Sequence, residues 1–227
     1  MNIKRVSGNT QGKFPKIRKG KDYRQTIAAL LMDSAKMAGA DPIAVGRVFS
    51  ENGIKSVLIG GLVVGCHTGR PRVTQDLDVI VDVPELNKKI ITQLGKVVGS
   101  KKVEKHPSFI TFLKGSNVGD REVLDVIISK AGSYRLVFDN CMALSVGDFE
   151  LLIPTAEMLV VLKYTAAVNP VRSKAKQAQD WADILAILDA NLTINLYTIA
   201  YLANEVVPGW GDDLRTKIFL HRKGNAI

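Results

Sequence analysis

Three aspartates on apolar segments are the residues of this sequence best suited to chemistry. Asp76 and Asp78 stand one residue apart at the start of the apolar run 77–83, and Asp125 lies inside a second apolar run, 123–128. Side chains alternate faces along a strand, so Asp76 and Asp78 are expected on one face, about 7 Å apart. Carboxylates placed in this way repel one another and are costly in apolar surroundings unless positive charge lies between them.

Divalent cations explain all three carboxylates together. Mg²⁺, or Mn²⁺ in its place, prefers carboxylate oxygens, and two such ions can activate an attacking oxygen and stabilise a leaving phosphate. The sequence therefore predicts that Asp76, Asp78 and Asp125 are catalytic and bind metal. The competing interpretation takes them one at a time: Asp76 would cap a strand, Asp78 would pair with an arginine, and Asp125 would lie at a sheet edge.

A glycine pair upstream favours the metal interpretation. Gly60 and Gly61 follow an apolar strand and precede an apolar segment with helical character, and fourteen residues separate them from Asp76. Backbone N–H groups at such a turn can bind phosphate oxygens. The glycines and the acids would then lie at opposite ends of one nucleotide site.

The elements around these motifs favour an α+β fold, in which helices flank a mixed β-sheet and a helical part follows. Consecutive strands in the middle of the chain argue against a purely alternating arrangement. We expect a basic, flexible tail over 1–21, a core over 22–153 and a C-terminal helical region over 154–227. Periodicity and capping residues predict helices at 23–38, 42–52, 84–98, 155–168, 173–191 and 195–206, strands at 56–60, 77–83, 101–105, 108–114 and 121–129, and short strands and turns over 134–153.

The charge of the chain favours a polyanionic partner. The net charge is +9, and the first 21 residues contain seven Lys or Arg and no acid. The two cysteines, Cys66 and Cys141, match no metal-ligand spacing and are expected to be reduced thiols. No apolar run is long enough to span a membrane and no signal peptide is recognised, so a cytoplasmic protein without membrane contact is expected.

The motifs resemble those of the nucleotidyltransferase superfamily typified by DNA polymerase β. The matching pieces are "GG" at 60–61, "TQDLD" at 74–78 and "LDV" at 124–126. Within that superfamily, "GGLVVGCHTGRPRVTQDLDVIV" is most similar to the abortive-infection type enzymes, which include bacterial toxins of toxin–antitoxin pairs. The resemblance is specific over about 55–130 and looser over 150–190.

The resemblance implies further site residues. A helical lysine that contacts nucleotide phosphates corresponds to Lys163, and the acid of a D-x-x-D segment corresponds to Asp180, with Asp183 as a further candidate. Many members carry a serine after the first glycine, where this chain has Gly61. Phosphate binding would then depend on backbone N–H groups, with the Thr74 hydroxyl as a further donor. Guanidinium groups suit phosphate, so Arg72, with Arg70, could also bind the triphosphate.

The predicted reaction moves a nucleoside monophosphate from an NTP, ATP among them, to an acceptor hydroxyl and releases pyrophosphate. The basic surface makes RNA, such as a tRNA end, the first expectation for the acceptor, and the toxin-like resemblance implies an antitoxin-like protein partner. Two alternatives stay open from the sequence. One is a small-molecule adenylyltransferase of the aminoglycoside-modifying type, and the other is a non-catalytic nucleotide-binding regulatory protein.

Overall fold

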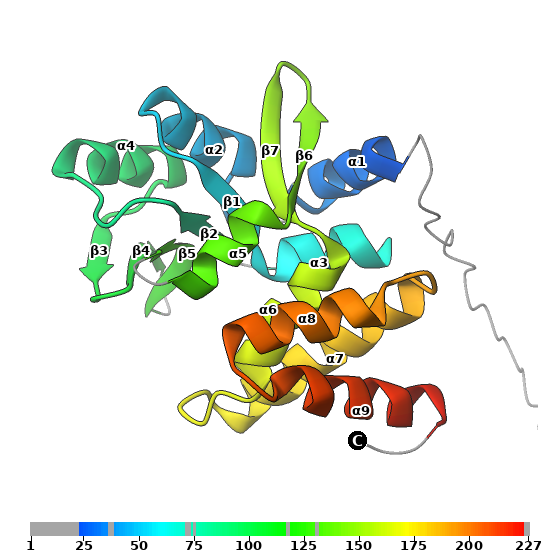
Figure 1. Ribbon diagram of the computed structural model, residues 1–227. Helices are drawn as coiled ribbons and strands as arrows, with labels where there is room; N and C mark the ends of the chain where they lie inside the picture. Colours follow the sequence, from blue (N-terminus) through cyan, green and yellow to red (C-terminus); the bar gives the residue numbers. More distant parts are fainter. Residues whose placement is uncertain are drawn as a thin grey trace, which may run out of the picture.

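The computed structural model describes residues 23–35, 39–70, 74, 76–116, 119–129 and 132–224 (Figure 1). The expected basic tail at 1–21 lies outside these residues, and so does Arg72. The described part is α+β, as predicted: helices flank a five-stranded mixed sheet, and a group of helices follows it along the chain.

The five-stranded sheet has the order β1-β2-β5-β4-β3. Strand β2 runs parallel to β5, and the other neighbouring pairs, β1–β2, β5–β4 and β4–β3, are antiparallel. Most of β2 is buried, because it lies inside the sheet with the apolar helix α3 against it. The strands are β1 (Ser56–Ile59), β2 (Leu77–Val81), β3 (Lys102–Lys105), β4 (Phe109–Ser116) and β5 (Gly119–Ile128).

Capping residues define the ends of several helices, as the sequence predicts. Helix α2 (Pro42–Glu51) begins with Pro42 after Asp41, whose Oδ1 accepts a hydrogen bond of 2.9 Å from the backbone N–H of Ile43. Thr155 caps α6 (Ala156–Ala167) in the same way. Helix α3 (Gly60–Thr68) follows β1 without a connecting loop, because Gly60 adopts a φ of 77° that L side chains rarely allow.

Three segments differ from the sequence-based expectation. Helix α4 (Lys88–Val98) begins after Asn87, whose side chain caps it, and not at Pro84. Residues 134–139, expected as strands and turns, belong to helix α5 (Gly132–Asp139), which precedes a hairpin of β6 (Cys141–Val146) and β7 (Phe149–Pro154). A further helix, α9 (Trp210–Arg222), follows the last predicted one.

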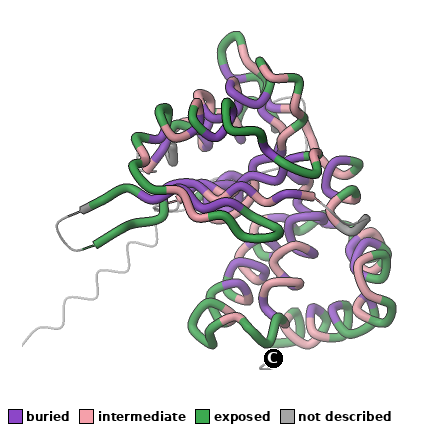
Figure 2. The backbone as a smooth tube through the Cα atoms, turned by 90° about the vertical axis from the view of Figure 1, so that its left-hand side faces the viewer, coloured by how far each residue is buried: buried purple, intermediate pink, exposed green. Residues whose placement is uncertain are grey.

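The C-terminal helices form a second layer beside α3. They are α6, α7 (Lys174–Ala190), α8 (Leu196–Val206) and α9, and α7 packs against both α6 and α3 (Figure 1). Helix α1 (Tyr23–Ala35) also packs on α3. Buried residues of the sheet, of α3 and of these helices belong to one hydrophobic core, and Figure 2 colours the buried parts of the backbone purple. None of the described helices is long and apolar enough to cross a membrane.

His67 joins the two layers. Its ring is fully buried, Nε2 lies 2.9 Å from the carbonyl oxygen of Pro154, and its own carbonyl accepts a hydrogen bond from Asn191 at the end of α7. This residue therefore has a structural role. Cys66 and Cys141 are both free thiols, and burial raises the pKa of the Cys66 thiol to about 12.

Candidate active site

Asp78 and Asp125 occupy partnered positions on neighbouring parallel strands. In the β2–β5 register, Asp78 lies opposite Asp125, and in the β1–β2 register it lies opposite Ile59, the residue before Gly60. The structure thus brings together the glycine turn and two of the three predicted carboxylates. Asp76 lies just before β2, which begins at Leu77 like the predicted strand 77–83, and its charge acts on Asp78.

Two threonines orient the outer carboxylates. The Thr74 hydroxyl donates to Oδ1 of Asp76 at 2.7 Å, and the Thr111 hydroxyl, on β4, donates to Oδ1 of Asp125 at 2.6 Å. Asp125 and Thr111 are partners in the β4–β5 register. Each hydrogen bond uses one carboxylate oxygen and fixes the direction of the side chain. Thr74, expected to donate to a phosphate, here positions a candidate metal ligand.

The pKa values of Asp78 and Asp125 are both raised. The pKa of Asp78 is raised to about 7, and burial is the largest cause of this shift. The negative charges of Asp76 and Asp125 raise the pKa further. Burial also raises the pKa of Asp125, against a lowering by the Thr111 hydrogen bond. The negative charges of Asp76 and Asp125 are thus close enough to oppose ionisation of Asp78. A bound cation would relieve this repulsion.

Positive charge reaches this cluster from the helical layer. Lys163, on α6, and Arg172, in the connection from α6 to α7, both act to lower the pKa of Asp78, and Lys176, in the first turn of α7, acts to lower that of Asp125. The carboxylates on the sheet and the cations on the helices therefore face the same space. A triphosphate bound between them would meet both kinds of group.

Two buried acids hold the cations in place. Nζ of Lys163 lies 3.0 Å from Oδ1 of Asp180 and 2.8 Å from Oδ2 of Asp183, and Nε of Arg172 lies 2.7 Å from Oδ2 of Asp180. The side chains of Asp180 and Asp183 are 2% and 5% exposed, against 37% for Arg172. Asp180 thus contacts both cations, and Arg172 keeps a solvent-facing part.

The start of α3 borders the carboxylates. A Cβ added to Gly60 would lie 1.9 Å from Oδ2 of Asp78, so the backbone of this glycine lies directly against the carboxylate. Gly61 follows in the first turn of the helix, where backbone N–H groups lack partners within the helix. Arg70, at the other end of the α3 segment, is exposed.

The donor set suits hard cations, although it is not a preformed ligand cluster. Among the side chains that the structure describes, no group of three or more His, Cys, Asp or Glu is arranged to hold a metal ion. The chemistry of the donors nevertheless fits Mg²⁺ or Mn²⁺, because Asp78 carries a raised pKa caused partly by two other carboxylates.

Sequence reasoning missed Thr111, Arg172 and Lys176 at this site. Thr111 sits in an alternating strand, where a threonine is unremarkable, and its role depends on the pairing of β4 with β5. Arg172 and Lys176 precede the D-x-x-D segment at 180–183. Their positive charge close to that segment is the feature of the sequence from which they could have been identified as site residues. Only packing of α7 against α6 and α3 brings them toward the sheet.

One family model of known proteins matches most of this chain. The family model described as "Nucleotidyl transferase AbiEii toxin, Type IV TA system" matches residues 44–219. A search of curated proteins gives no match. A solved structure, an antigenic nucleotidyltransferase-like protein from Paracoccidioides brasiliensis, is similar with 15% identity and a TM-score of 0.42, over 86% of this chain and 92% of that one. The family match spans most of the chain and includes the glycine turn, the three aspartates and the cationic helices, so this protein belongs to the AbiEii family of nucleotidyltransferase toxins.

Proposed function

We propose that this protein is a metal-dependent nucleotidyltransferase that moves a nucleoside monophosphate from an NTP to a hydroxyl of RNA. The observation that carries the proposal is the pairing of Asp78 with Asp125 on β2 and β5, beside Gly60 and opposite Lys163. Carboxylates on one side and cations on the other suit a metal-bound triphosphate better than a neutral ligand.

The reaction exchanges one phosphorus–oxygen bond for another. The acceptor oxygen bonds to the α-phosphorus, the bond from that phosphorus to the bridging oxygen of the β-phosphate breaks, and pyrophosphate leaves. Asp125 takes the proton of the acceptor hydroxyl, a role that suits a carboxylate whose pKa is raised by burial. Divalent cations, when bound, would supply charge stabilisation at the phosphate oxygens.

The protein's own residues divide the remaining work. Asp76, Asp78 and Asp125 would hold the cations, with Thr74 and Thr111 fixing the outer two carboxylates. Backbone N–H groups of Gly60 and Gly61, with Lys163, would bind the triphosphate, and Arg172 would add its exposed guanidinium. Asp180 acts on the nucleotide through Lys163 and Arg172, which it contacts directly. Catalysis then consists of positioning and charge stabilisation.

The proposal that the acceptor is RNA is based on the charge of the protein. A net charge of +9 favours a polyanion over a small cationic acceptor such as an aminoglycoside. The family is one of toxin–antitoxin systems, so we also infer that a cognate antitoxin counters the activity.

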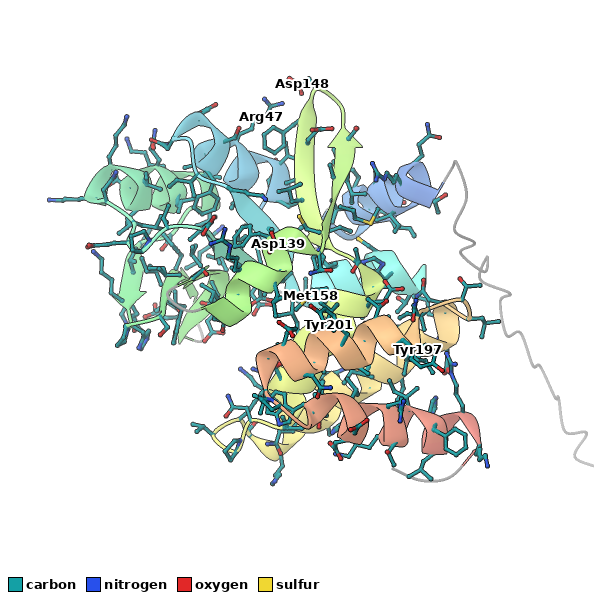
Figure 3. All side chains as sticks on the ribbon, viewed as in Figure 1. Arg47, Asp139, Asp148, Met158, Tyr197 and Tyr201 are labelled. Atoms are coloured by element: carbon teal, nitrogen blue, oxygen red, sulfur yellow. The ribbon has the colours of Figure 1, made fainter. Side chains whose placement is uncertain are left out.

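Labelled NTPs test this function directly. We expect the purified protein with Mg²⁺ to transfer label from an α-³²P-NTP to total RNA and to release pyrophosphate. Asp78→Asn and Asp125→Asn should abolish transfer. Asp148→Asn is the matched control, because Asp148 lies in the turn between β6 and β7 and pairs with Arg47 (Figure 3). Label on an aminoglycoside but not on RNA, or full activity of Asp78→Asn, would contradict the proposal.

A further inference from the structure

Exposed aromatic and apolar side chains gather at one end of the C-terminal helices. Leu192, Tyr197 and Phe219 are each more than half exposed, and Tyr197 is 79% exposed. Tyr197 and Tyr201 stand one turn apart on α8 (Figure 3). Large exposed rings are unfavourable in water unless a partner covers them, so this concentration indicates an interaction surface.

A groove separates α8 from α9 at this place. Its volume is about 410 Å³, and it is lined by Leu196, Tyr197, Arg215, Thr216 and Phe219. Tyr201 does not line it. Two aromatic rings from facing helices thus border a groove within the size range of small-ligand sites, roughly 300–1,000 Å³.

Cations lie beside the aromatic rings of the groove. Nζ of Lys223 lies 4.4 Å from the centroid of the Phe219 ring, and Arg222 adds another cation in the last turn of α9. The acids nearby already have partners: Asp212 lies 3.7 Å from Arg215, and Asp189 lies 3.3 Å from His221. Aromatic rings with lysine and arginine are the combination that binds unpaired nucleotides, because bases stack on the rings and cations meet the phosphates.

The groove is remote from the carboxylates. The contact between Asp189 and His221 places the C-terminal end of α9 against the C-terminal end of α7. Lys176, whose charge acts on Asp125, lies at the N-terminal end of α7. Helix α7 has 17 residues and is therefore about 25 Å long. The end of α9 that carries Phe219 thus lies near the end of α7 opposite to Lys176.

We propose that the groove between α8 and α9, lined by Tyr197, Phe219 and Arg215, binds an unpaired base of the acceptor RNA several nucleotides from its reacting end. This inference rests on the RNA acceptor proposed above. Stacking explains why rings and cations, and not cations alone, are exposed here.

Binding of fluorescein-labelled RNA tests the proposal without requiring turnover. The probes are an unstructured single-stranded RNA, a fully paired RNA hairpin closed by a short linker, and unfractionated tRNA. We expect Tyr197→Ala and Phe219→Ala each to weaken single-strand binding about 5- to 100-fold. The paired probe should change little. Arg215→Gln should reduce the slope of log affinity against log salt by about one.

Tyr201→Ala is the matched control, because it removes another exposed tyrosine, one turn away, that does not line the groove. It should bind every probe as the wild type does. Equal RNA binding by Tyr197→Ala, Phe219→Ala and Tyr201→Ala would overturn the proposal, and so would absence of RNA binding by the wild type. Loss of binding to a protein partner with unchanged RNA binding would also overturn it.

The same variants separate this proposal from the proposed reaction. RNA binding that depends on Tyr197 and Phe219, with no label transferred by the wild type from any NTP, would support the groove and contradict the transferase function. Label transfer that is unaffected by Tyr197→Ala and Phe219→Ala at limiting RNA would support the transferase and overturn the groove.

Discussion

Gly60 lies against the carboxylate of Asp78, with no room between them for a side chain. A Cβ at this position would be 1.9 Å from Oδ2 of Asp78, and the φ of Gly60 is 77°. Gly60→Ala should therefore displace Asp78 and abolish nucleotidyl transfer, besides lowering the melting temperature. Gly53 has a φ of 68° with nothing within 4 Å of an added Cβ. Gly53→Ala should lose about 1–2 kcal/mol of stability and keep its activity. Equal activities of the two variants would show that the contact with Asp78 is unimportant.

Asp78 should reduce the stability of the metal-free protein at neutral and alkaline pH. The pKa of Asp78 is raised from 3.8 to about 7, so the folded state favours the neutral carboxyl group. The protein therefore loses stability as the pH rises toward and through about 7. In EDTA, we expect Asp78→Asn to melt roughly 5 °C or more above the wild type at pH 8, with the difference vanishing below about pH 4. Asp148→Asn should show no such dependence. Differential scanning fluorimetry across pH measures this, and a difference independent of pH would refute it.

Divalent cations should compete with protons at the same carboxylates. Metal binding requires Asp78 to be ionised, and its pKa is about 7. We expect Mg²⁺ to raise the melting temperature of the wild type at pH 8 and to do so much less at pH 6. In Asp78→Asn and Asp125→Asn, the effect should be small at both values. A Mg²⁺ effect of the same size in the wild type and both variants would place the cation elsewhere.

Removal of the Lys163 ammonium should destabilise the fold. Asp180 and Asp183 are almost fully buried, and Lys163 contacts both. Lys163→Met leaves buried acids without this partner, and we expect a loss of about 3 kcal/mol in the free energy of unfolding at pH 8. Adding Asp183→Asn to Lys163→Met should restore part of it, since one buried charge is removed. Urea unfolding measures these values, and an unchanged midpoint for Lys163→Met would contradict the assignment.

Arg172 should contribute to NTP binding more than to stability. Its side chain is 37% exposed, and it faces the space in front of Asp78. We expect Arg172→Gln to raise the KM for NTP about tenfold, the effect of losing one charge-assisted phosphate contact. Arg47 also pairs with an aspartate, on the β6–β7 turn away from the site. Arg47→Gln should leave the KM unchanged, and equal KM values for the two variants would remove Arg172 from the site.

Local sequence patterns were sufficient to predict most of the helices and strands. Alternation and apolar runs predicted β1 to β5, and the caps Asp41 and Thr155 predicted where α2 and α6 begin. Where local signals compete, prediction was wrong. Pro84 resembled a helix start, but Asn87 accepts the capping hydrogen bond from Ile90. The segment that forms α5 contains aromatic and β-branched residues that also suit strands, and burial of Val137 and Phe138 against the rest of the chain decides for helix.

The sequence by itself indicated which groups could react: the aspartates and the glycine pair follow from residue type and spacing, and the helical lysine follows from the resemblance to the nucleotidyltransferases. Only the tertiary structure decided which of these groups meet. The parallel pairing of β2 with β5 places Asp78 opposite Asp125, across 47 residues of chain, and packing of α7 on α6 brings Asp180 to Lys163 and Arg172. Local pattern does not specify such pairings, because strand register and helix packing depend on burial of the whole core.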